Sequence, residues 1–147
     1  MPKSISTNTL FYGDNLPILR NRDYFPDASV DLVYTNGVFH HIPPQERGAA
    51  LGFIRRALRP GGILAFWENN PWSLAARYVM SRIPFDRDAV MCSAGTARRL
   101  ARASGFGVLR TDYLFVFPRA LDRLRPVEAW LHGLPVGAQY QVLCHRP

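Results

Sequence analysis

The sequence predicts an α/β domain with a mostly parallel sheet, because short apolar runs alternate with segments of helical periodicity. Two runs, residues 30–34 and 63–67, end at small polar residues, which is typical of strands inside a parallel sheet. The last two predicted strands, residues 108–117 and 139–144, are close enough in sequence to form an antiparallel pair at the C-terminal edge. We therefore expect a single domain over residues 1–147.

The elements of the N-terminal part are short. Residues 9–12 are apolar and aromatic and stop at a Gly-Asp pair, which predicts a brief strand ending in a loop. Residues 16–20 predict one or two helical turns. Residues 30–34 are rich in β-branched and aromatic side chains and predict a buried strand that feeds a loop at Asn36 and Gly37.

A helix is predicted to begin at Pro43-Pro44, because a proline in the first turn loses no hydrogen bond. Pro60 and the two glycines after it end this helix, and residues 63–67 then predict a strand that is buried on both faces. The helix has an apolar face (Ala50, Leu51, Ile54, Ala57 and Leu58) and arginines that we expect to face water (Arg47, Arg55, Arg56 and Arg59).

The C-terminal part contains clearer boundary signals. Residues 72–92 lack a regular pattern and predict an irregular segment. A helix is predicted over residues 93–104, since Ser93 can cap its start and Gly105 can end it. Residues 119–131 predict a short helix that restarts near a proline.

Composition narrows the class of protein. The chain has 48% hydrophobic residues and a net charge of +7, and no apolar run approaches the length of a membrane span. The N-terminus has no long apolar segment, so we expect no signal peptide and a cytoplasmic location. Seventeen of the chain's 18 basic residues are arginines. The densest groups of arginines have the spacing of solvated helix faces, which does not favour a nucleic-acid binder. We expect Cys92 to be a loop thiol and Cys144 a core residue.

Polar and small residues follow three of the predicted strands. Because ligands bind beyond the carboxyl ends of strands in open α/β sheets, these segments predict a site on one rim of the sheet. Each segment alone also fits an ordinary turn. The segments are Gly13-Asp14, Thr35-Asn36-Gly37 and Glu68-Asn69-Asn70.

Two histidines, His40 and His41, follow the second of these segments. A histidine there could act as a general base or could simply cap a helix. No third ligand follows at metal-site spacing, so the sequence predicts no metal site. The charged loop from Asp86 to Asp88 could bind substrate or form internal salt bridges, and the sequence leaves both open.

Residues 27–147, and most clearly 27–62, resemble a class I S-adenosylmethionine-dependent methyltransferase. The resemblance implies that this chain has part of the Rossmann-like fold of that family. The resemblance rests on VDLVY at residues 30–34, the His-His loop and LRPGG at residues 58–62, in that order. It implies methyl transfer from S-adenosylmethionine to a small-molecule or lipid acceptor. It also implies roles for residues already singled out: donor binding by Asp14, Tyr34, Thr35, Asn36 and Gly37, catalysis by His41 and His40, and acceptor binding by Glu68, Asn69 and Asn70.

The sequence departs from that family in its N-terminal part. The Gly-rich donor-binding turn is lacking, because the only G-x-G, Gly105-Phe106-Gly107, follows a helix and precedes a strand. Residues 8–34 resemble the start of amino-methylating DNA methyltransferases, but the two prolines that should follow Asn36 are missing. The domain therefore reads as truncated or chimeric. Two alternatives stay open: a non-catalytic module that docks on a protein partner or a second copy, and a DNA amino-methyltransferase or its remnant.

Overall fold

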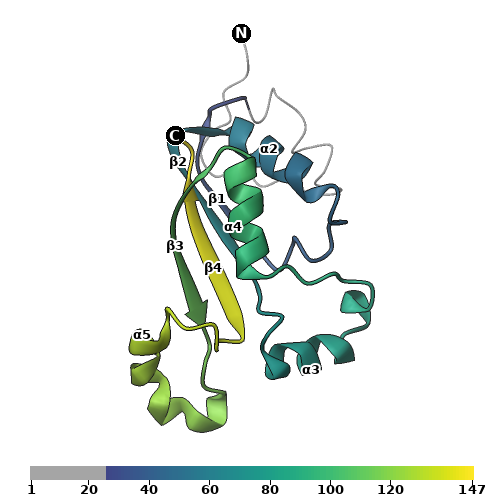
Figure 1. The fold of residues 1–147 in the computed structure, drawn as a ribbon, viewed down its shortest axis with the longest axis vertical. Coiled ribbons are helices and arrows are strands. Elements are labelled where there is room, and N and C mark those ends of the chain that lie inside the picture. Colours follow the sequence, from purple (N-terminus) through teal and green to yellow (C-terminus); the bar gives the residue numbers. More distant parts are fainter. Residues whose placement is uncertain (1–25) are drawn as a thin grey trace.

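A computed structural model describes residues 26–147, which form one four-stranded sheet flanked by helices (Figure 1). The strand order is β1-β2-β4-β3. β1 and β2 pair in parallel, and β4 runs antiparallel to both β2 and β3. The predicted α/β class and the antiparallel pairing of the last two strands are confirmed, with β4 inside the sheet and β3 at its edge. The strands are β1 (Val30–Asn36), β2 (Leu58–Asn69), β3 (Gly107–Leu114) and β4 (Gln139–His145).

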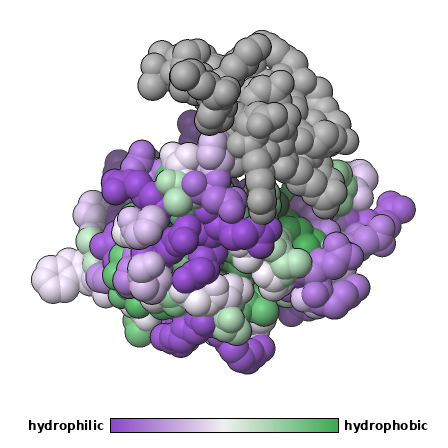
Figure 2. Space-filling view, turned by 90° about the horizontal axis from the view of Figure 1, so that it is seen from above, coloured by the Kyte–Doolittle hydropathy of each residue, from purple (hydrophilic) through white to green (hydrophobic). Residues whose placement is uncertain are grey.

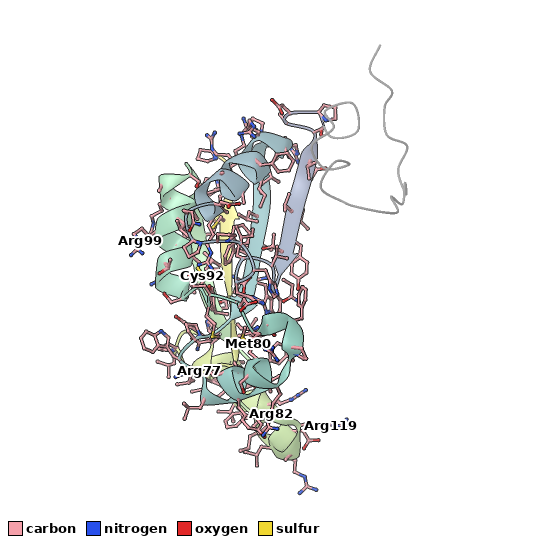
Figure 3. The ribbon with its side chains drawn as sticks, turned by 90° about the vertical axis from the view of Figure 1, so that its right-hand side faces the viewer. Arg77, Met80, Arg82, Cys92, Arg99 and Arg119 are labelled. Atoms are coloured by element: carbon pink, nitrogen blue, oxygen red, sulfur yellow. The ribbon has the colours of Figure 1, made fainter. Side chains whose placement is uncertain are left out.

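Two helices, α2 (Arg47–Ala57) and α4 (Ala94–Ala103), cover one face of the sheet, as the perpendicular views of Figures 1 and 3 show. The shorter elements gather near the end of the sheet where β1 and β2 finish. They are α3 (Leu74–Arg82), the 3₁₀ segments η1 (Pro84–Asp86) and η2 (Arg119–Val127), and α5 (Glu128–Leu131).

The core lies between this face and the two helices. Leu51 of α2 packs there with Leu64 and Phe66 of β2 and Val142 of β4, and none of them is more than 3% exposed. Each large apolar side chain buried in this way contributes on the order of 2 kcal/mol to folding. Because alternate residues of a strand point to opposite faces, the same strands must present their other side chains to the opposite face.

That opposite face is open in β1, where Leu32 is 58% and Tyr34 54% exposed. The prediction of a buried strand at residues 30–34 was therefore wrong for this side. β-branched and aromatic residues favour a strand but do not reveal whether a helix covers it. Within residues 26–147, α2 and α4 pack against the core on the other face of the sheet.

The helix predicted over residues 93–104 is confirmed as α4. The Ser93 hydroxyl oxygen accepts a hydrogen bond from the backbone N–H of Thr96 at 3.2 Å, and Gly105 follows the helix with a positive φ of 82°. The irregular segment predicted at residues 72–92 is wrong in its first half, since it contains α3. Ser73 caps this helix by accepting from the N–H of Ala76.

Helix α2 begins at Arg47, a few residues after the predicted start at Pro43-Pro44, which lie in a preceding turn. Exposed arginines such as Arg56 and Arg59 fit the predicted solvated surface. Figure 2 shows large hydrophilic areas at the end of the molecule nearest α2. In the described part of the chain, no helix is long and apolar enough to cross a bilayer. Some predictions concern residues outside the described range. They are the strand at residues 9–12, the helical turns at residues 16–20, and the predicted site residues Gly13 and Asp14.

Candidate functional site

The carboxyl ends of β1 and β2 meet at one rim of the sheet. Asn36 pairs with Trp67, and the backbone N–H of Gly37 donates to the carbonyl of Trp67 at 3.0 Å. Parallel pairing therefore brings two of the three predicted rim segments together. The third, Gly13-Asp14, cannot be compared because it lies outside the described residues.

Glu68 at the end of β2 is completely buried and has two partners on the loop after β1. One carboxylate oxygen accepts the backbone N–H of Phe39 at 2.6 Å, and the other lies 2.7 Å from Nδ1 of His40. A buried carboxylate is tolerated only with such partners. Because Glu68 occupies Nδ1, the His40 ring is fixed with Nε2 pointing away from β2.

Asp86, in η1, lies opposite this free edge of His40. Its Oδ1 is 3.4 Å from Nε2 of His40 and 3.3 Å from Nε2 of His41. The two imidazole rings are also in contact, with centroids 4.1 Å apart. We call Glu68, His40, His41 and Asp86 the rim cluster. Burial decreases outward through it: the side chains of Glu68 and His40 are 1% and 4% exposed, whereas that of His41 is 28% exposed.

Arg47, the first residue of α2, joins the loops on either side of the rim cluster. Its guanidinium donates from Nε to the Ile42 carbonyl at 2.9 Å and from Nη2 to the Val90 carbonyl. The N–H of Val90 in turn donates to the His40 carbonyl at 2.9 Å. Arg47 was predicted to face water but is 3% exposed. Helical spacing alone missed this role, because the loops that Arg47 joins are distant in sequence.

The predicted acceptor-binding residues after Glu68 use their side chains within the protein. Asn70 is buried and donates to the carbonyls of Gly137 and Pro135. Asn69 accepts from the amide of Gln139 at 3.0 Å. These contacts fasten the end of β2 to the loop before β4, and an acceptor role for the three residues stays a prediction.

The predicted donor-binding residues line the end of β1. The hydroxyl of Thr35 is buried and has no hydrogen-bond partner within residues 26–147, and a donor-binding role for it stays a prediction. Tyr34 points to the open face, where its ring meets that of Trp67 edge-on at 6.0 Å. Gly37 adopts a positive φ of 63°, which allows the chain to turn sharply toward His40.

Both cysteines are buried free thiols, so Cys144 is a core residue as predicted, whereas Cys92 is a loop residue that is shielded from solvent. Burial raises the pKa of the Cys92 thiol, against a smaller opposing effect of the Arg47 charge. Burial also raises the pKa of Cys144, to about 11. Neither thiol therefore has the lowered pKa of a reactive nucleophile.

One family model matches part of the amino-acid sequence. Residues 19–66 match the family model described as a methyltransferase domain. No curated protein sequence matches the chain significantly.

Several solved structures are similar to a larger part of the chain than the family model is. A SAM-dependent methyltransferase from Archaeoglobus fulgidus is 14% identical, with a TM-score of 0.65, and the alignment covers 92% of this chain and 66% of that one. A possible histamine N-methyltransferase from Thermotoga maritima is 18% identical, with a TM-score of 0.65, over 82% of this chain and 58% of that one. A Haloferax volcanii putative methyltransferase, in complex with the Trm112 activator, is 20% identical, with a TM-score of 0.55, over 84% and 56%.

The chain thus spans about two thirds or less of the length of these structures. At such identities the similarity establishes the fold, and the family model independently covers β1 and α2 and most of β2. The resemblance to class I methyltransferases is confirmed at the level of the fold: the chain has the fold of the S-adenosylmethionine-dependent methyltransferases, and its residues 19–66 match a model of a methyltransferase domain.

Proposed function

We propose that this protein transfers a methyl group from S-adenosylmethionine to a small-molecule or lipid acceptor. The observation that carries the proposal is the rim cluster, which lies at the carboxyl ends of β1 and β2 in a methyltransferase fold. Ligands of open α/β sheets bind at this end. The named neighbours act with S-adenosylmethionine, which supports the same methyl donor here.

On the donor side, the residues at the end of β1 fit a polar ligand. Within residues 26–147, the buried hydroxyl of Thr35 lacks a hydrogen-bond partner, and the neighbouring Asn36 is exposed. Thr35 and Gly37 would hold part of the donor from one side, whereas Tyr34 points to the open face of β1 and could contact the donor only from there. When bound, S-adenosylmethionine supplies an electrophilic methyl group to a nucleophilic oxygen, nitrogen or sulfur. The protein's contribution is then to hold the acceptor close and in line.

On the acceptor side, His41 is the member of the rim cluster that solvent and substrate can reach. We assign it the acceptor's proton, and Asp86, 3.3 Å from Nε2 of His41, would stabilise the resulting imidazolium. His40 is buried and positioned by Glu68, so it orders Asp86 rather than touching the acceptor.

A hollow of about 420 Å³ adjoins this group, and Asp86 is one of its lining residues. Three arginines, Arg77, Arg82 and Arg87, line the same hollow with Met80. Figure 3 shows Arg77, Met80 and Arg82 together on α3. Arginines pair well with carboxylates and phosphates, which favours an acceptor with an acidic group, such as an anionic lipid headgroup or a small organic acid.

Thermal unfolding with and without S-adenosylmethionine tests the donor site. A ligand present at about 100 times its Kd stabilises the native state by about 2.7 kcal/mol, which raises the melting temperature by several degrees. A Thr35→Val variant should lose part of this shift, whereas Thr96→Val, in α4, should keep it. A cooperative transition that S-adenosylmethionine does not move would refute the enzyme function for this chain alone.

One observation favours a second function, a module that docks on a partner. Leu32 and Tyr34 leave an apolar area on the open face of β1, and the chain spans only part of the length of its neighbours. We propose that the remaining part of a methyltransferase fold, in the same polypeptide or in a partner, packs on this face. The Haloferax volcanii neighbour, which is bound to an activator, supports the partner form.

Light scattering on the purified chain tests this second function. If the face is left uncovered in the purified chain, the chain should self-associate through it in a concentration-dependent way, and Leu32→Lys should abolish the association because a charge then lies on the open face. Leu109→Lys, on the exposed bulge of β3, is the matched control. A wild-type chain that stays monomeric at all concentrations would contradict it.

The third interpretation, a DNA methyltransferase, predicts duplex binding that weakens steeply with salt.

A further inference from the structure

We propose that His40, His41 and Asp86 form a site for a single zinc ion. The sequence showed no third ligand near the two histidines, but folding brings the Asp86 carboxylate to them from η1. One potential ligand atom from each of the three residues lies within 4.8 Å of the others. Two imidazoles and one carboxylate are a donor set that zinc commonly takes.

The distances from Asp86 to the two histidines are compatible with a shared cation. Oδ1 of Asp86 lies 3.4 Å from Nε2 of His40 and 3.3 Å from Nε2 of His41. Good N–H···O hydrogen bonds are shorter, at about 2.7–3.2 Å. A tetrahedral zinc ion with bonds of about 2.0–2.1 Å separates neighbouring ligand atoms by about 3.3 Å. Both separations therefore match the edge of a zinc tetrahedron.

Glu68 supplies the outer part of such a site. Metal-binding histidines usually donate their other ring N–H to a carboxylate, which fixes the tautomer and the ring orientation. Glu68 does this for His40 at 2.7 Å and is itself held by the N–H of Phe39. The ring nitrogen that faces Asp86 is then the one left free for a metal.

The charges around His40 and the exposure of His41 also fit a zinc site. His40 lies between two carboxylates, Glu68 and Asp86, whose side chains are 1% and 9% exposed. A dication there would balance two negative charges that are largely removed from water. Three protein ligands would leave a fourth position of a tetrahedral zinc ion open. His41 is more exposed than either carboxylate, so solvent can reach this side of the site.

The zinc site stands on this geometry, and only its catalytic role rests on the proposed function. With zinc bound, Nε2 of His41 is a ligand and no longer takes a proton. A hydroxyl or thiol acceptor in the open position would instead lose its proton to water, because coordination lowers its pKa. The resulting oxygen or sulfur anion would attack the methyl carbon of S-adenosylmethionine, so that the bond to its sulfonium sulfur breaks and S-adenosylhomocysteine leaves.

The test is a titration of the untagged chain with zinc chloride against a chromophoric zinc indicator, without S-adenosylmethionine. We expect one zinc ion per chain. Asp86→Asn should weaken binding by more than about tenfold, and Glu68→Gln by about 10–100-fold, as for other outer-sphere partners. Asp88→Asn in the same loop and His132→Gln, an exposed histidine on another element, should bind zinc as the wild type does.

Cobalt gives a second readout that is independent of activity. Tetrahedral Co²⁺ absorbs visible light far more strongly than octahedral Co²⁺, so the wild type should turn blue and His41→Gln should not. His41 lies near the surface, which lets this variant fold, as circular dichroism can confirm. A wild type that cannot compete with the indicator, or an Asp86→Asn variant with unchanged affinity, would overturn the zinc site. Donor binding is measured separately, so neither result depends on the other.

Discussion

The phenolic oxygen of Tyr140 donates a hydrogen bond of 2.7 Å to the backbone carbonyl of Cys92, and both residues are almost completely buried. This bond joins β4, in the middle of the sheet, to the loop that leads from the rim cluster into α4. It satisfies a carbonyl that has no access to water, so the loop depends on it.

Replacing Tyr140 with phenylalanine should therefore destabilise the protein by about 1–3 kcal/mol, the cost of leaving a buried carbonyl unpaired. Tyr113→Phe is the matched control, because Tyr113 is a neighbouring, partly buried tyrosine of β3. It should change stability by less than about 0.5 kcal/mol. Urea unfolding measures both, and equal effects of the two variants would show that the bond to Cys92 contributes nothing specific.

The stability of the protein should fall with pH between about 9 and 11 because of Cys144. Burial raises its pKa from 9.0 to about 11, so the native state favours the protonated thiol. This contribution is fully present below pH 9 and is lost as pH rises through the folded pKa. Since one pKa unit corresponds to about 1.4 kcal/mol, the loss is at most about 3 kcal/mol.

Cys144→Ala should flatten this dependence. Burial also raises the pKa of Tyr140, but its contribution is present in both proteins, so the difference between them isolates Cys144. Free energies of unfolding measured at pH 8, 9, 10 and 11 provide the comparison. Parallel curves for wild type and variant would contradict the buried-thiol explanation.

Two glycines should respond to alanine with opposite signs. Gly105 ends α4 with a φ of +82°, and an added Cβ would lie 2.9 Å from Nε of Arg55, so Gly105→Ala should cost about 1–2 kcal/mol. Gly52 lies inside α2, where its added Cβ would meet only Arg56 at 3.9 Å. Gly52→Ala should stabilise by up to about 1 kcal/mol through helix propensity. Thermal unfolding that shows the same sign for both would refute this distinction.

Local signals predicted some elements well and others poorly, for physical reasons. Ser93 and Gly105 act within their own turns, so α4 could be read from the sequence. Helix α3 was missed because its large apolar residues do not mark a buried face: Leu74 is 78% and Tyr78 61% exposed. The exposure of Leu32 in β1 likewise depends on what covers the sheet, which a strand pattern does not encode.

The sequence predicted only the part of the site that follows from the order of strands and helices along the chain. The ends of β1 and β2 had to meet in a parallel sheet, which placed Glu68 near His40 although they are 28 residues apart. That Asp86 faces both histidines depends on how α3 and η1 return to the rim, and this has no local signature. The buried position of Arg47 has the same origin.

Arg47 should be essential for this arrangement. Its guanidinium donates to the carbonyls of Ile42 and Val90, on either side of the rim cluster, and it is nearly inaccessible to water. Arg47→Met keeps much of the side-chain volume but leaves both carbonyls unpaired, so it should cost about 2–4 kcal/mol. Arg56→Met, on the exposed side of the same helix, should cost less than about 0.5 kcal/mol.

Hydrogen exchange separates a local from a global effect of Arg47→Met. The N–H of Val90 is bonded to the His40 carbonyl, so its protection reports whether the two loops stay together. If Arg47 clamps the loops, protection at Val90 should fall further than protection within β2, whose hydrogen bonds do not involve Arg47. A uniform loss across the sheet would instead assign Arg47 to overall stability, and unchanged protection at Val90 would remove it from the site.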